Sequence, residues 1–241
     1  NSDQGRHSTR HKLTAPLFFS ISDDLHSLTK GTLSCIPGVG GVVAELFEKV
    51  ITPPLARRRE VWMNQVAEAL NELRETILDF SWDKLREDET FLDIFLQAGQ
   101  IALRNHHAEK IVALKNAVCN SALKINLEET QQLVFLRYID ELTIVHLKLL
   151  DLMRDPRQWA TENNHKFPDF ITSALTNVIY HAFPELKAQE ALTELFVNDL
   201  QTRGLLQEVN IHGTLTFHGL MAARSTEMGN CFLRYISDPK K

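Results

Sequence analysis

The stretch from Leu127 to Arg154, LEETQQLVFLRYIDELTIVHLKLLDLMR, decides the fold class of this 241-residue chain. Two rows of side chains recur along it at helical spacing, namely Phe135, Ile139, Leu142, His146 and Leu149, and beside them Leu136, Val145 and Leu152. At 1.5 Å per residue, one helix over these positions would be about 40 Å long. A helix that is apolar over much of its circumference belongs in the middle of a bundle. The stretch therefore predicts a long central helix that ends at Asp155-Pro156.

Amphipathic helices are predicted on both sides of this stretch, because apolar residues repeat every three or four positions there. The predicted helices cover 17–30, 42–51, 55–78, 89–105 and 106–123, then a segment from Pro168 past Ile179, 184–203 and 227–236, with a loop at 80–88 and a short helical turn at Trp159. In the helix 184–203, the side chains expected to face inward are Ala188, Ala191, Leu192, Leu195, Phe196 and Leu200. Gly204 is suited to end that helix, and Thr226 is suited to cap the last one.

A single β signal follows the helix 184–203. Residues 205–211, a turn at His212-Gly213 and residues 214–217 predict a short hairpin. The segment 192–206, LTELFVNDLQTRGLL, followed by a hairpin and a terminal helix, resembles a winged-helix module. That resemblance implies either DNA binding through the helix before the hairpin or a protein contact at the same place.

The charges of that helix favour the protein contact. Between Pro184 and Arg203 there are two basic residues, Lys187 and Arg203, and four acidic residues, Glu185, Glu190, Glu194 and Asp199, a net charge of −2. Neutralisation of phosphates by Lys and Arg supplies much of the affinity of DNA-binding proteins. The sequence therefore predicts that nucleic acid is not the partner of this unit.

A second candidate contact region lies at 33–62. It contains the turn IPGVGG (36–41), an amphipathic helix over 42–51, Pro53-Pro54 as the end of that helix, three arginines and a tryptophan. The residues singled out as an interaction surface are Val43, Phe47, Arg57, Arg58, Arg59 and Trp62. Three interpretations remain open: the region docks on a partner protein, it lies in an anionic membrane interface, or it is the first hairpin of the bundle with its apolar stripe in the core.

The motifs IPGVGG (36–41) and PPLARRR (53–59), with the closing segment 226–236, resemble those of uncharacterised bacterial helical proteins. The resemblance implies a bacterial cytosolic accessory protein, related to stress or phage defence, and it implies no activity.

Enzyme and metal signatures are not found in the sequence. The three cysteines, Cys35, Cys119 and Cys231, are far apart, and the adjacent pair His106-His107 does not have the spacing of metal ligands on a helix. Neither a nucleophile elbow nor a phosphate-binding loop is present. We therefore expect no catalytic residues, no cofactor and no metal.

Composition and apolar runs agree with an ordinary globular protein. The hydrophobic fraction is 44%, the charged fraction is 24% and the formal net charge is −5. No run approaches the roughly 20 apolar residues that span a bilayer, which favours a cytoplasmic protein.

Taken together, these patterns predict a mainly α fold, a helical bundle with a C-terminal winged-helix-like unit that contains one short β-hairpin. The expected divisions are a flexible arm at 1–16, a helical domain at 17–125 and a helical, winged-helix-like domain at 126–241. The expected function is that of a non-enzymatic protein-interaction or regulatory accessory protein, acting on a protein partner or by self-association. The alternatives are a membrane-associating effector that uses 33–62, and a winged-helix DNA-binding regulator.

Overall fold

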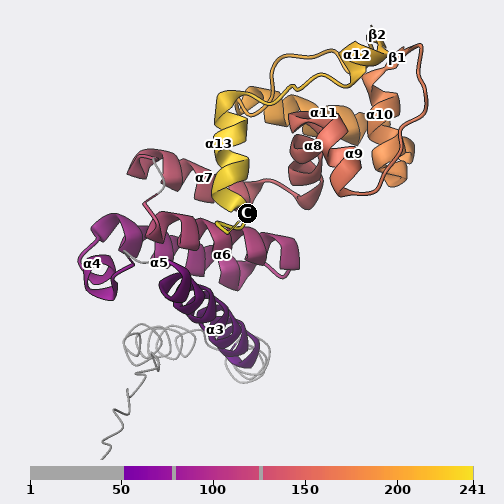
Figure 1. Cartoon of the computed structure of the whole chain (residues 1–241). Coiled ribbons are helices and arrows are strands. Elements are labelled where there is room, and N and C mark those ends of the chain that lie inside the picture. The colour runs from indigo at the N-terminus through magenta and orange to yellow at the C-terminus, as the bar shows by residue number, and fades with distance from the viewer. Residues whose placement is uncertain (1–51, 78–79, 125–126, 241) are drawn as a thin grey trace, which may run out of the picture. The chain divides into compact units, whose positions relative to one another are not determined.

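The computed structural model describes residues 52–77, 80–124 and 127–240, with side chains from residue 55 onward, and this part of the chain is mainly helical (Figure 1). Its elements are α3 (Thr52–Thr76), α4 (Trp82–Arg86), α5 (Glu89–Arg104), α6 (Ala108–Ala122), α7 (Glu129–Glu141), α8 (Ile144–Arg154), α9 (Pro156–Glu162), β1 (Thr172–Ala174), α10 (Leu175–Ala182), η1 (Pro184–Ala188), α11 (Glu190–Thr202), β2 (Thr214–Thr216), α12 (Phe217–Leu220) and α13 (Glu227–Ile236). The predicted fold class, a helical bundle with one small antiparallel sheet, is confirmed. No helix among the described residues is long and apolar enough to cross a membrane.

The chain divides into two compact units, Asn1–Ala67 and Glu68–Lys241, and the boundary falls inside α3. The predicted arm at 1–16 and the predicted helices before residue 52 lie outside the described residues. The predicted division at residue 125 also remains a prediction, since residues 125 and 126 are not described.

The helix predicted at 55–78 corresponds to α3, which begins three residues earlier, at Thr52. Pro53 and Pro54 therefore lie in the first turn of α3, whereas the sequence pattern predicted that they end a preceding helix. A first turn tolerates proline, because its N–H groups have no partner within the helix.

α5 and α6 form an antiparallel pair that begins the core of the second unit (Figure 1). The carboxylate of Asp88 accepts a hydrogen bond from the backbone N–H of Phe91 and so caps α5, and Asn105 ends α5 as predicted. Ile94, Ala98 and Leu114 are fully buried. The loop predicted at 80–88 is wrong in part, because Ser81 caps the one-turn helix α4 within it.

The single long helix predicted over 127–154 is wrong. α7 ends at Glu141, Leu142 and Thr143 have extended backbone angles, and α8 starts at Ile144. Thr143 is the N-cap of α8, and its backbone N–H donates to Nδ1 of His146 over 3.0 Å. The break is favourable because the side chain of His146 satisfies a backbone donor that the interrupted helix leaves free. As a result α7 packs on α5 and α6, while α8 packs on α9, α10 and α11.

The two strands come from distant parts of the sequence. The strand β2 was predicted at 214–217. It pairs with β1, in the register Thr172↔Thr216 to Ala174↔Thr214, so the partner strand predicted at 205–211 is wrong. Within that segment, Leu206 instead makes an isolated bridge with Ser225. In the C-terminal part, α8 packs against α10 and α11, and the small sheet of β1 and β2 lies beside α12 (Figure 1).

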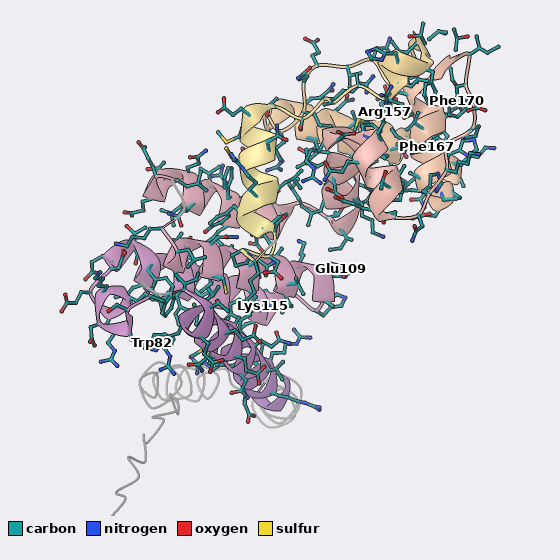
Figure 2. The ribbon with its side chains drawn as sticks, viewed as in Figure 1. Trp82, Glu109, Lys115, Arg157, Phe167 and Phe170 are labelled. Atoms are coloured by element: carbon teal, nitrogen blue, oxygen red, sulfur yellow. The ribbon has the colours of Figure 1, made fainter. Side chains whose placement is uncertain are left out.

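Aromatic contacts hold the segment that leads into β1, and they replace the helix predicted from Pro168. The ring of Phe167 lies 6.2 Å from that of Trp159 in α9, and the ring of Phe170 lies 5.6 Å from that of His181 in α10 (Figure 2). Ile171 is 89% exposed, so it does not face inward as predicted. The helix begins only at Leu175, because the preceding residues pair in the sheet.

The C-terminal helix α13 matches the predicted bounds, and Thr226 caps it as predicted. Its side chains Phe232 and Tyr235 are fully buried against Phe135 of α7, with ring centroids 5.3 and 5.7 Å away. The side-chain amides of Asn116 and Asn120 in α6 donate to backbone carbonyls at the end of α13. Aromatic packing and amide hydrogen bonds therefore both fix α13 to the bundle.

Candidate interaction surface

The helix α11 has two apolar sides, and the bundle buries one of them. Thr193, Val197 and Leu200 are fully buried on the inner side, whereas Leu192 is 44% exposed and Leu195 is 57% exposed on the other. Both leucines were predicted to face inward, and this prediction is wrong. Helical periodicity places apolar residues on faces, but it does not tell which of two apolar faces meets the core.

Local hydrogen bonds fix the position of α11. At its start, the Thr193 hydroxyl donates to the carbonyls of Leu186 and Gln189, at 3.4 and 3.1 Å. At its end, Gly204 adopts a φ of +72°, and its N–H donates to the carbonyl of Gln201. Glycine adopts this left-handed conformation without steric cost, as the sequence predicted for the end of this helix. Hydrogen bonds therefore define both ends of α11.

Two exposed acidic side chains lie on a different side of α11, next to His212. Glu190 and Glu194 are spaced i, i+4 on α11, and their side chains are 67% and 52% exposed. The ring of His212 lies beside both, with Nδ1 3.8 Å from Oε1 of Glu190 and Nε2 4.0 Å from Oε2 of Glu194. The hydroxyl of Tyr180 is buried without a hydrogen-bond partner among the described residues. Its burial, and to a smaller extent the charges of Glu190 and Glu194, raise the pKa of Tyr180. We call the exposed pair Leu192 and Leu195 the outer face of α11, and the two glutamates lie on another side of this helix.

The basic residue at the end of α11 is engaged within the fold. Arg203 donates to Glu141 of α7 over 2.6 Å and to Asp199 over 3.1 Å, and its guanidinium lies 5.5 Å from the ring centre of Tyr138. Hydrogen bonds to Glu141 raise the pKa of Arg203 further. This arginine is therefore held between α7 and α11 and is not extended toward an external anion.

The residues predicted from the 33–62 region are only partly described. Val43 and Phe47 lie outside the described residues. Arg57 and Arg58 are exposed and Arg59 is half-buried in α3. Trp62 is 3% exposed, so its side chain is buried, and the role of this region in contacts remains a prediction. Trp62 belongs to the buried stripe that also includes Val66.

A polar group around His146 has a partial likeness to a catalytic triad. Nε2 lies 3.3 Å from Oδ2 of Asp199, and Nδ1 lies 2.9 Å from the hydroxyl oxygen of Thr143. However, Nδ1 also accepts the backbone N–H of Thr143, so its lone pair is already used. Burial is the main cause that lowers the pKa of His146, and it favours the neutral form of the ring. The arrangement is that of a helix cap, as expected for a hydrogen-bonded core histidine.

No group of three or more His, Cys, Asp or Glu side chains is placed to hold a metal ion within residues 52–77, 80–124 and 127–240. The rings of His106 and His107 pack on one another, with centroids 4.1 Å apart. Of the cysteines, Cys119 is buried, and its burial raises the pKa of the thiol to about 11. A thiol with so high a pKa is a poor nucleophile.

No protein-family model, curated protein or solved structure matches this chain. The observation that marks the outer face of α11 as a candidate interaction surface is therefore the exposure of Leu192 and Leu195.

Proposed function

We propose that this protein is a non-enzymatic interaction protein, of a regulatory or accessory kind, and that it docks a partner protein on the outer face of α11. The observation that carries the proposal is the exposure of Leu192 and Leu195 on a helix whose other side is already buried. The resemblance of the segments 36–41 and 53–59 supports placing the protein in the bacterial cytoplasm.

The leucines offer enough apolar area to anchor a contact. Full burial of an exposed leucine side chain contributes about 1.5–3 kcal/mol, so covering two half-exposed leucines contributes about 2 kcal/mol. Leu192 and Leu195 are three positions apart on one helix, the spacing with which a helix presents anchors to another helix. Because both ends of α11 are fixed, docking would cost little ordering of the backbone.

DNA readout by α11 is less well supported. α11 carries the exposed Glu190 and Glu194, and Arg203 is engaged with Glu141. Carboxylates at the position that would face phosphates repel them. The membrane alternative depends on Val43 and Phe47, which lie outside the described residues, and no observation on the described residues favours it.

Photo-cross-linking in the native cell tests the proposal. A photo-reactive amino acid is placed at position 195, and as a matched control at position 112, where Val112 of α6 is 50% exposed. We expect protein adducts at position 195 that are absent at position 112. Equal labelling at the two positions, or no adduct at either, would contradict docking on α11.

A further inference from the structure

The connection between α7 and α8 depends on one nitrogen atom. Nδ1 of His146 accepts the backbone N–H of Thr143 over 3.0 Å, so this nitrogen carries a lone pair and not a proton. The proton of the neutral ring then lies on Nε2, 3.3 Å from Oδ2 of Asp199. In return, the side chain of Thr143 accepts the backbone N–H of His146. The bond to Nδ1 therefore exists only while the imidazole is neutral.

This connection joins two differently packed helices. α7 packs on α5 and α6, α8 packs on α9, α10 and α11, and only two residues with extended backbone angles lie between them. Leu142 is fully buried and holds the chain at the end of α7, whereas Thr143 is exposed. Water can therefore reach the backbone of Thr143 once its bond to His146 is lost. We call residues 142–146 the α7–α8 joint.

The surroundings of His146 make acid act on the joint. Burial is the largest influence on the pKa of the ring and lowers it; Asp199 raises the pKa, and Arg203 and Lys110 lower it. Arg203 is itself paired with Glu141. When the joint opens, water solvates the ring, and its pKa returns toward the ordinary value of about 6.5. The open joint thus binds a proton more readily than the closed one, and acid favours opening.

We infer that the α7–α8 joint is an acid-sensitive switch, in which protonation of His146 turns Nδ1 from an acceptor into a donor and opens the first turn of α8 while the rest of the bundle stays folded. The protonated Nδ1 can donate to the hydroxyl oxygen of Thr143, 2.9 Å away. The backbone N–H of Thr143, however, then faces a second donor and loses its acceptor. Its replacement acceptor is water, which requires the turn to open.

Native-state hydrogen exchange of the full chain, followed by NMR, tests the switch. Protection factors of the Thr143 and His146 amides, corrected for the intrinsic exchange rate, are measured from pH 8 to pH 5. We expect both to fall about five-fold, since one proton taken up on opening changes the opening equilibrium by at most about ten-fold per pH unit. Their exchange should not respond to low concentrations of urea, because a local opening exposes little surface, whereas exchange of the buried Val118 in α6 should respond.

Three variants separate titration from mere loss of a contact. In His146→Gln the amide oxygen can still accept the N–H of Thr143, as glutamine does in a capping box, but it gains no proton in this range, so the pH dependence should vanish. The matched control is His218→Gln at an exposed position of α12, which should keep the full pH dependence. Asp199→Asn should enlarge the fall, because the closed ring loses the carboxylate that raises its pKa.

Protection at Thr143 that does not change with pH overturns the switch, and so does an undiminished pH dependence in His146→Gln. If Thr143 and Val118 exchange with the same dependence on urea, the joint opens only when the whole fold does, and the switch is again wrong. A smaller fall in Asp199→Asn than in the unmodified protein would show that His146 is not the group that takes up the proton.

Discussion

The side-chain amide of Asn120 donates to the backbone carbonyl of Tyr235 over 2.8 Å, although the two residues are 115 positions apart in sequence. The same amide also lies 2.9 Å from the carbonyl of Ser237 and 3.3 Å from that of Arg234. The last carbonyls of a helix have no partner within it, so this one side chain of α6 satisfies the end of α13.

Replacing Asn120 is therefore expected to destabilise the fold. Asn120→Ala leaves buried carbonyl oxygens without a donor, and we expect the free energy of unfolding to fall by about 2 kcal/mol. Urea titration followed by circular dichroism measures the change. Asn198→Ala, at an exposed position of α11, is the control and should change stability by less than about 0.5 kcal/mol. Equal effects of the two substitutions would show that the hydrogen bonds to α13 contribute nothing.

Gly229 lies where α13 comes close to the backbone of Leu205. A Cβ atom at this position would lie 2.2 Å from the carbonyl oxygen of Leu205, a backbone atom that cannot turn aside. We expect Gly229→Ala to cost about 3 kcal/mol of stability, as overpacking against a rigid neighbour does. Thermal unfolding should show the loss, whereas Gly219→Ala, whose Cβ would lie 3.5 Å from its nearest neighbour, should be close to neutral. An unchanged melting temperature for Gly229→Ala would contradict this contact.

His146 should make stability depend on pH. Burial lowers the pKa of this imidazole in the folded protein, so between the folded and the unfolded pKa the unfolded chain binds more protons. The free energy of unfolding then rises with pH, and the contribution is lost as pH falls below the unfolded value of about 6.5. Urea titrations from pH 8 to pH 5 measure this slope. His146→Leu should flatten it, and a slope identical to that of the unmodified protein would exclude His146 as its source.

The two sides of α11 should respond differently to substitution. Leu192→Ser with Leu195→Ser changes exposed residues, and each should alter the free energy of unfolding by about 0.5 kcal/mol or less. Val197→Ala opens space in the core and should cost about 2 kcal/mol. Chemical denaturation of the variants checks both values. A large fall in the free energy of unfolding caused by the two serine substitutions would mean that the leucines stabilise the fold and are not free to bind a partner.

The sequence was sufficient to predict most of the helices, because their caps and their apolar rows are local features. The helix at 227–236, the cap at Thr226 and the end at Gly204 needed no knowledge of distant residues. The break at Thr143 was missed because the apolar rows continue through it. His146, read as a core residue, is also the side chain that stabilises the break.

Contacts between residues far apart in the sequence could not be predicted. β1 has three residues and pairs with β2 about 40 positions later, so neither its existence nor its partner is apparent from a local pattern. Likewise, the outward orientation of Leu192 and Leu195 depends on which face of α11 meets α8. The sequence did predict the acidic character of α11, because Glu190 and Glu194 lie within the helix predicted at 184–203.

The hydroxyl of Thr226 donates to the carbonyl of Gly204, two residues after the end of α11, and the N–H of Thr226 donates to the carbonyl of Leu205. The start of α13 and the end of α11 thus share one set of bonds, so neither end can fray alone. Amide protons in the first turn of α13 and in the last turn of α11 should exchange with solvent at a common rate. A helix seated on α11 would slow that exchange at both places, although it touches only one of them.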